Sequence, residues 1–245
     1  MLTSAQINRT PMAFVLCLPL LVATSVSAQV FVDDFNDNRI DPNVWSVELH
    51  GLGAEVAEQN QELEFTMLAG ASGGEFGARL TSVFLLRGDF DIQIDFSLLE
   101  WPYHNGVRMA IAITDALYDD YGVERSSLSA SEPLGAQEVY VADFTGGPIQ
   151  LVPTQDFSGS LRLVRSGPTQ TGYYYGSGGW IPILTGPAPT EDMAIQLHAW
   201  SHDYAFQHQV VRSAFDNFTI MTGEVLWPAM PAEATSWGSI KTLYR

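Results

Sequence analysis

The segment DFDIQIDFSL, residues 89–98, decides the fold class of this chain. Apolar residues occupy every second position of the segment, and aspartate, glutamine and serine fill the positions between them. Successive side chains of a β-strand point to opposite faces of a sheet, so this alternation predicts a strand with one buried face. Segments 107–114 and 193–200 alternate in the same way and predict further strands.

The rest of the chain extends this pattern, and no amphipathic helix is predicted before residue 224. A series of short strands separated by turns rich in glycine, proline and asparagine predicts two packed antiparallel sheets. We therefore expect an all-β, two-sheet antiparallel jelly-roll sandwich over residues 29–222, followed by a linker and C-terminal tail over 223–245. The further strands are expected at 31–35, 44–48, 63–68, 78–83, 139–141, 161–165, 173–175 and 210–220, and a polar loop at 126–135.

The N-terminal residues 1–28 have the features of a secretory signal peptide. They contain Arg9, an apolar run at 11–22 that is too short to span a membrane, and small residues up to Ala28 at the expected cleavage site. We expect the mature chain to begin at Gln29 and to be secreted to the periplasm, the cell surface or the medium, without a membrane span. The single cysteine, Cys17, lies in this leader, which excludes a disulfide framework in the mature chain.

The charge of the chain restricts its partners. It carries 28 acidic and 11 basic residues, for a formal net charge of −17. Nucleic acids and anionic membranes attract basic surfaces, so this balance argues against both as partners.

Short motifs spread along the chain resemble those of concanavalin A-like lectin/glucanase domains, of the LamG-like jelly-roll kind. The resemblance implies a sandwich whose concave face often binds glycans. The glucanase branch of that superfamily carries a Glu-x-Asp-x-Glu strand, which this chain lacks. The motifs that carry the resemblance are VDDFNDN at 32–38, EQNQELE at 58–64, GDFDI at 88–92, SLRLVRSG at 160–167 and AFDNF at 214–218.

Several aromatic residues occupy positions expected to face away from the core or to lie in loops. Sugars stack their apolar faces on aromatic rings, while polar side chains bind their hydroxyl groups. We therefore expect a secreted, non-catalytic, lectin-like module that binds an extracellular glycan or polysaccharide. Its candidate ligand-binding residues are the aromatic set Trp101, Tyr103, Tyr140, Tyr173, Trp180, His198 and Trp200, and the polar set Asp91, Gln93 and Arg108, expected on one common face.

A structural calcium ion is a further expectation. Oxygen-bearing side chains crowd residues 33–38, and calcium prefers several oxygen ligands. The first and last strands are neighbours in sandwiches of the type that this chain resembles. Asp34 and Asp216 are therefore the candidate metal ligands.

Two other functions remain open. One is a structural or adhesive domain that binds a cell-surface protein through an exposed apolar patch. The other is a glycoside hydrolase or lyase with an unrecognised site, which requires two carboxyl groups that converge in a cleft.

Overall fold

The computed structural model describes residues 31–115 and 120–228. All the regular secondary structure within these ranges consists of β-strands. The expected leader, its cleavage site and most of the C-terminal tail lie outside the described residues. The strands are β1 (Phe31–Asp33), β2 (Trp45–Gln59), β3 (Glu62–Ser82), β4 (Leu85–Glu100), β5 (Arg108–Thr114), β6 (Asp120–Leu128), β7 (Gln137–Phe144), β8 (Ile149–Pro153), β9 (Ser158–Ser166), β10 (Thr169–Gly176), β11 (Gly179–Pro187), β12 (Ala194–His202) and β13 (Val211–Leu226).

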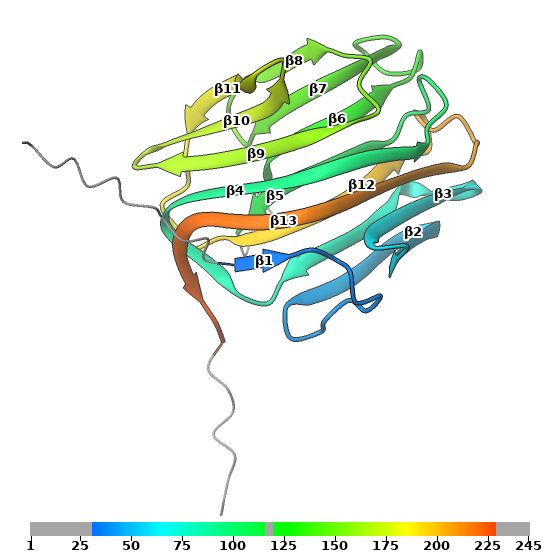
Figure 1. The fold of residues 1–245 in the computed structure, drawn as a ribbon. Coiled ribbons are helices and arrows are strands. Elements are labelled where there is room, and N and C mark those ends of the chain that lie inside the picture. Colours follow the sequence, from blue (N-terminus) through cyan, green and yellow to red (C-terminus); the bar gives the residue numbers. More distant parts are fainter. Residues whose placement is uncertain (1–30, 116–119, 229–245) are drawn as a thin grey trace, which may run out of the picture.

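The strands form two packed layers, and every strand pair is antiparallel (Figure 1). The front sheet of this view has the order β11-β10-β9-β4-β13, and β1 also pairs with β13. The back sheet has the order β12-β5-β6-β7-β8. This arrangement confirms the predicted all-β sandwich.

The long strand β3 belongs to both sheets. Its residues 63–67 pair with β13 of the front sheet, and its residues 75–81 pair with β12 of the back sheet. The partner strand β2 bends with it, with register shifts on both sides of Leu52. Gly51 and Gly53 have φ values of +63° and +78°, and a Cβ atom on Gly51 would lie 2.5 Å from that of Phe76. Only glycine fits so tight a corner.

Alternating apolar residues of the two sheets meet in one core. Ile92 and Ile94 of β4 belong to the same buried cluster as Ile111 of β5 and Leu197 of β12. Burying such a side chain stabilises the fold by about 1.5–3 kcal/mol. The alternating apolar residues of 89–98, 107–114 and 193–200 therefore form the buried faces of their strands, as the sequence predicted.

Some predicted boundaries were wrong. The separate strands at 63–68 and 78–83 are both part of β3, because the glycines between them form a bulged corner within the strand rather than a reversal of the chain. The expected loop at 126–135 begins with the end of β6, and the strands β6, β8 and β11 were not predicted at all. Within the described part of the chain, no helix is long and apolar enough to cross a membrane.

Candidate functional site

The outward face of the back sheet carries a set of polar side chains that line two hollows. The pairing register sets Arg79 of β3 beside His198 of β12, and His198 beside Ala110 of β5. Ala110 in turn pairs with Glu124 of β6. Residues two apart on a strand share a face, so this row has neighbours of the same orientation on both sides.

The first hollow in this face has a volume of about 330 Å³, and small residues form its floor. Ala110, Ala112 and Gly122 lie in the middle, and a Cβ atom on Gly122 would lie only 3.1 Å from that of Ala112. Larger side chains at these positions would fill the space. The walls are Glu75, Arg79, His198 and Trp200 on one side and Glu124, Asp143 and Thr145 on the other.

A second hollow of about 270 Å³ continues the first. It shares Glu124 and Asp143 with the first hollow, so the two form one groove with these carboxylates at its centre. The volumes of both hollows are close to the lower end of the range of small-molecule sites, about 300–1,000 Å³. The rest of the second hollow is more apolar and includes Leu128, Pro133, Leu134, Val141, Ile149, Leu151 and the exposed ring of Tyr204.

Arg108 lies between the carboxylates and the aromatic wall. Its guanidinium donates to Glu132 Oε1 at 2.6 Å and lies 4.9 Å from the centre of the Trp200 ring. Burial lowers the pKa of Arg108, but the charges of Glu124 and Glu132 and the bond to Glu132 outweigh burial and raise it. Arg108 therefore stays charged and holds the Trp200 indole in place by a cation–π contact.

The two central carboxyl groups have different environments. Burial raises the pKa of Asp143, although the nearby charge of Arg108 opposes this effect. Glu124 accepts a hydrogen bond from the hydroxyl group of Ser126 at 2.8 Å. An acid with a raised pKa beside a second carboxylate is an arrangement capable of proton transfer to a ligand.

His198 is 5% exposed, and its Nδ1 atom has no hydrogen-bond partner among the described residues. Burial and the neighbouring charge of Arg79 lower its pKa to about 3. The imidazole ring is therefore neutral near pH 7, and His198 lines the groove wall.

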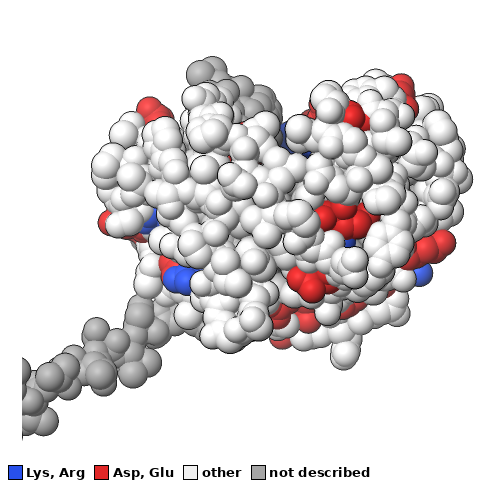
Figure 2. All heavy atoms as spheres, turned by 90° about the horizontal axis from the view of Figure 1, so that it is seen from above, with Lys and Arg blue, Asp and Glu red and all other residues white. Residues whose placement is uncertain are grey.

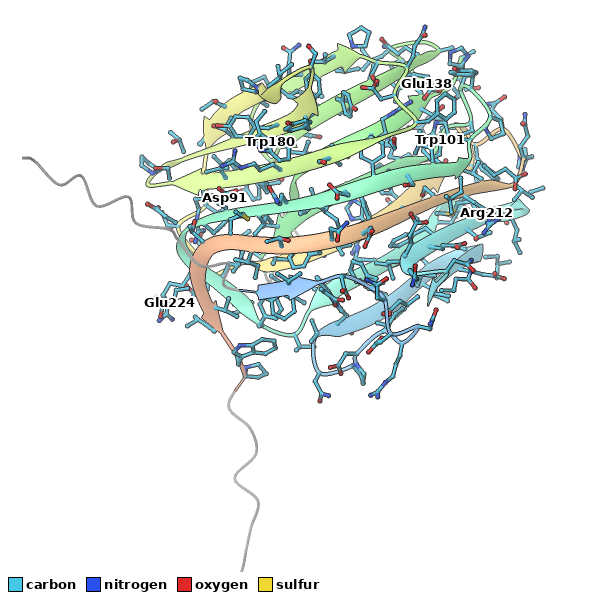
Figure 3. The ribbon with its side chains drawn as sticks, viewed as in Figure 1. Asp91, Trp101, Glu138, Trp180, Arg212 and Glu224 are labelled. Atoms are coloured by element: carbon cyan, nitrogen blue, oxygen red, sulfur yellow. The ribbon has the colours of Figure 1, made fainter. Side chains whose placement is uncertain are left out.

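One end of the sandwich is tied together by a buried network around Glu138 of β7. Its carboxylate accepts hydrogen bonds from Trp101 Nε1 at 3.0 Å and from the backbone N–H of His104 at 2.9 Å. Trp101 and Glu138 lie together at this end (Figure 3). Burial alone would raise the pKa of Glu138, but these bonds, a Ser127 hydroxyl and the charge of Arg125 lower it.

Only part of the predicted ligand-binding set reaches the groove. Arg108, His198 and Trp200 line it. Tyr103 is exposed and packs edge-on against Phe157, outside the residues that line the groove. Asp91, Gln93 and Arg108 were expected on one face, but of these three only Arg108 lines the groove.

Two of the predicted rings are core residues. Tyr140 is 1% exposed and stacks on Tyr174 with ring centres 4.5 Å apart. Val139 and Val141 have the opposite orientation and belong to a separate buried cluster, and Val141 lines the groove. The bulky Tyr140 and Phe144 therefore define the inner face of β7. Trp101 is also buried, with its N–H bonded to Glu138.

Four predicted residues lie on the other surface of the sandwich, the outward face of the front sheet. Arg162 of β9 joins three of them, because it forms a two-pronged ion pair with Asp91 and lies 5.4 Å from the ring centres of Tyr173 and of Trp180. The fourth, Gln93, pairs with Arg162 in the strand register. Asp91 and Trp180 are labelled on this sheet in Figure 3. Period-two alternation separates the two faces of one strand but does not say which sheet the strand joins.

The groove residues Glu75, Arg79, Glu124 and Asp143 were not predicted. Glu124 lies on β6, whose inward positions include the charged Arg125, so the strand lacks the apolar alternation that revealed its neighbours. Asp143 shares its orientation with Val139 and Val141, and it would have been found by assigning the large aromatic residues of β7 to the core.

The predicted calcium ligands lie near each other. Burial raises the pKa of Asp216, and the charges of Asp95 and Asp34 raise it further. Both carboxylate oxygens of Asp216 accept hydrogen bonds from Asn217. The described residues contain no group of three or more His, Cys, Asp or Glu side chains arranged to hold a metal ion. The calcium site therefore remains a prediction.

Comparison with protein families gives one match. A family model described as a protein of unknown function, the DUF1583 C domain, matches residues 10–196. No curated protein sequence matches this chain significantly.

Solved structures of the same architecture include several glucanases. A Bacillus licheniformis β-glucanase superposes with a TM-score of 0.57 at 10% identity, over 78% of this chain and 97% of that chain. A β-1,3-1,4-glucanase (lichenase) from a mouse hindgut metagenome gives 0.56 at 10% identity, over 78% and 97%. An immunostimulatory antigen and pseudo β-1,3-glucanase of Mycobacterium tuberculosis gives 0.57 at 11% identity, over 80% and 99%. At such identities the likeness shows the concanavalin A-like jelly-roll fold and nothing finer.

Proposed function

This chain belongs to the family of DUF1583 C domains, a family of unknown function, and on that premise we propose that it binds a carbohydrate chain in the groove of its back sheet. The observation that carries the proposal is the continuity of the two hollows through Glu124 and Asp143. A linear glycan needs a groove open along its length, with rings to stack on and polar groups to bind its hydroxyls.

The ring best placed for stacking is Trp200. It is part-buried at the groove wall, where Arg108 holds one side of the indole. His202 meets the indole edge-on at 5.0 Å, and Tyr204 stacks on His202 at the same distance. These rings form a short aromatic ledge beside the second hollow, rigid enough to bind a sugar without a large loss of side-chain entropy.

Secretion belongs to the same proposal. The signal-peptide features of residues 1–28 support export, and an extracellular glycan would then be the natural ligand. Expression with residues 1–28 in place, followed by N-terminal sequencing of exported protein, should give a chain that starts at Gln29. Retention of an uncleaved chain inside the cell would contradict this part of the proposal.

The experiment for the groove is a glycan array followed by calorimetry of the best ligand. Trp200→Ala should weaken binding at least tenfold, which corresponds to about 1.4 kcal/mol. Trp180→Ala is the matched control, because it removes the same ring from the opposite surface. Equal affinities of wild type and Trp200→Ala, or an equal loss in both variants, would contradict binding in the groove.

A second candidate function is hydrolysis of the bound glycan. It is favoured by the two carboxyl groups at the centre of the groove, one of which, Asp143, has a raised pKa. Glycosidases of the common types use such a pair, with one group protonated as the acid. The chain lacks the glucanase strand motif, so binding without cleavage remains our first proposal.

A further inference from the structure

The wall of the first hollow contains a basic residue without a strong partner. Arg79 extends from β3 into the groove, and its Nε atom is buried with no hydrogen-bond partner among the described residues. Its ion pair with Glu48, from Nη1 to Oε2, is 3.9 Å long, and the Glu48 side chain is half exposed. A contact of this length and exposure contributes little.

Other arginines of the chain are paired closely. Arg162 holds Asp91 with both prongs of its guanidinium, and Arg108 donates to Glu132 at 2.6 Å. Arg212 lies 2.5 Å from Glu64, and Arg125 lies 2.8 Å from Glu138. In a chain with an excess of acidic residues, a part-buried arginine so weakly paired in a groove is a candidate to bind a ligand.

His198 pairs with Arg79 in the strand register and lines the same hollow. Like Arg79, it has a buried side-chain nitrogen, Nδ1, without a hydrogen-bond partner among the described residues, and the residue is more than nine-tenths buried. A buried polar atom without a partner costs about 1–3 kcal/mol of free energy. A ligand carboxylate that reached this wall would give the part-exposed guanidinium of Arg79 a strong partner beside His198.

Resting on the carbohydrate-binding function proposed above, we propose that Arg79 and His198 form a subsite for the carboxylate of an acidic sugar, so that the glycan is a uronate. The planar guanidinium fork matches a carboxylate in two parallel bonds, whereas a single sugar hydroxyl uses only part of it. The neutral imidazole of His198 adds a polar contact without adding a second charge.

The remaining charges of the groove set the orientation of the ligand. Glu75 shares the hollow, and Glu124 and Asp143 line the side opposite Arg79. These acidic groups repel a carboxylate and accept hydrogen bonds from hydroxyls. A uronate residue therefore binds with its carboxylate toward Arg79 and its hydroxyl groups toward the central acids.

The test uses matched ligand pairs. Calorimetry compares an oligogalacturonate with its methyl ester, and an oxidised, C6-carboxylated cello-oligosaccharide with the neutral parent. We expect the acidic member of one of these pairs to bind at least tenfold more tightly than its neutral partner. The Arg79→Gln variant should lose that preference, and Arg79→Lys, which keeps the charge without the fork, should lose part of it.

Arg39→Gln is the control, because it removes the same charge from an exposed position outside the groove. It should leave the preference unchanged, and thermal unfolding of each variant checks that it folds. A sulfated oligosaccharide bound with equal Arg79 dependence would overturn the choice of carboxylate.

The outcomes separate this inference from the broader one. In one outcome, neutral glycans bind as tightly as acidic ones, Trp200→Ala weakens this binding and Arg79→Gln does not. That outcome would support carbohydrate binding in the groove and contradict the uronate subsite. Failure of every acidic and neutral glycan to bind would contradict both.

Discussion

Oε2 of Glu138 lies 2.8 Å from Nη2 of Arg125, and both side chains are buried. The same carboxylate holds the loop after β4 through Trp101 and His104. Figure 2 shows how sparse basic atoms are among the acidic ones on the surface seen from above. The buried pair of Arg125 and Glu138 therefore links the strands of the back sheet to the loop after β4.

Replacement of Glu138 by alanine should destabilise the protein strongly. It leaves Arg125 buried without its counter-ion, and breaking a buried pair in this way costs about 3–5 kcal/mol. Urea unfolding measures the difference. Arg87→Gln, which breaks an ion pair on the surface with Asp192, is the control and should change the midpoint little. Similar losses in both variants would show that the Glu138 network has no special role.

Acid should destabilise the fold through His198. Its pKa is about 3 in the folded protein, against about 6.5 in the unfolded chain, so the unfolded state takes up a proton first as the pH falls. The resulting loss in the free energy of unfolding begins near pH 6.5 and grows until about pH 3. Between pH 7 and pH 5 it reaches roughly 2 kcal/mol by linkage.

The measurement for His198 compares unfolding free energies of wild type and His198→Gln across this range. The variant should lose less stability on acidification, whereas the exposed His50→Gln should behave as wild type. The pH dependence of the wild type alone does not isolate His198. Glu58, Glu62 and Asp143 have raised pKa values, so their protonation stabilises the folded state as the pH falls and opposes the effect of His198. Parallel curves for wild type and His198→Gln would contradict the assignment.

The central carboxyl groups separate binding from hydrolysis. If the groove cleaves its ligand, Glu124→Gln and Asp143→Asn should each lower the rate of reducing-end release by 10²-fold or more. Both variants should still bind the intact glycan, because each keeps a polar side chain of the same size. Absence of reducing ends with wild type and a ligand of confirmed affinity would leave binding alone as the function.

Calcium should raise the thermal stability if Asp34 and Asp216 bind it. A ligand present at 100 times its dissociation constant stabilises the folded state by about 2.7 kcal/mol. Melting curves with calcium and with EDTA test this, and Asp216→Asn should remove the difference. Identical curves for the wild-type protein would rule out the site.

The fold class was readable from the sequence because the central strands bury one face each. Ile92, Ile94, Ile111 and Leu197 occupy the inner positions that their alternation predicts. The corner of β2 and β3 was not readable, since glycines near Gly53 and at 70–74 are typical of a turn as much as of a bulge. The resulting strand belongs to two sheets at once, which depends on pairings distant in the sequence.

The site was harder to predict than the fold. Trp200 and Arg108 stood out because they lie opposite apolar positions of well-marked strands. Glu124 did not, because the inner face of β6 carries Arg125 in place of an apolar residue. The face of Tyr140 was assigned wrongly because both faces of β7 are apolar, one toward the core and one toward the groove. Only packing against the second sheet distinguishes them.

The place of β13 has a consequence for how the protein is made. This last strand of the described chain lies between β4 and β3 and pairs with both. Until β13 is synthesised, the edges of β3 and β4 that it covers have no partner strand. The polypeptide cannot complete its front layer during synthesis, and the waiting strand edges of β3 and β4 are open to pairing with another copy. Truncation before Val211 should therefore yield aggregates rather than a smaller folded unit.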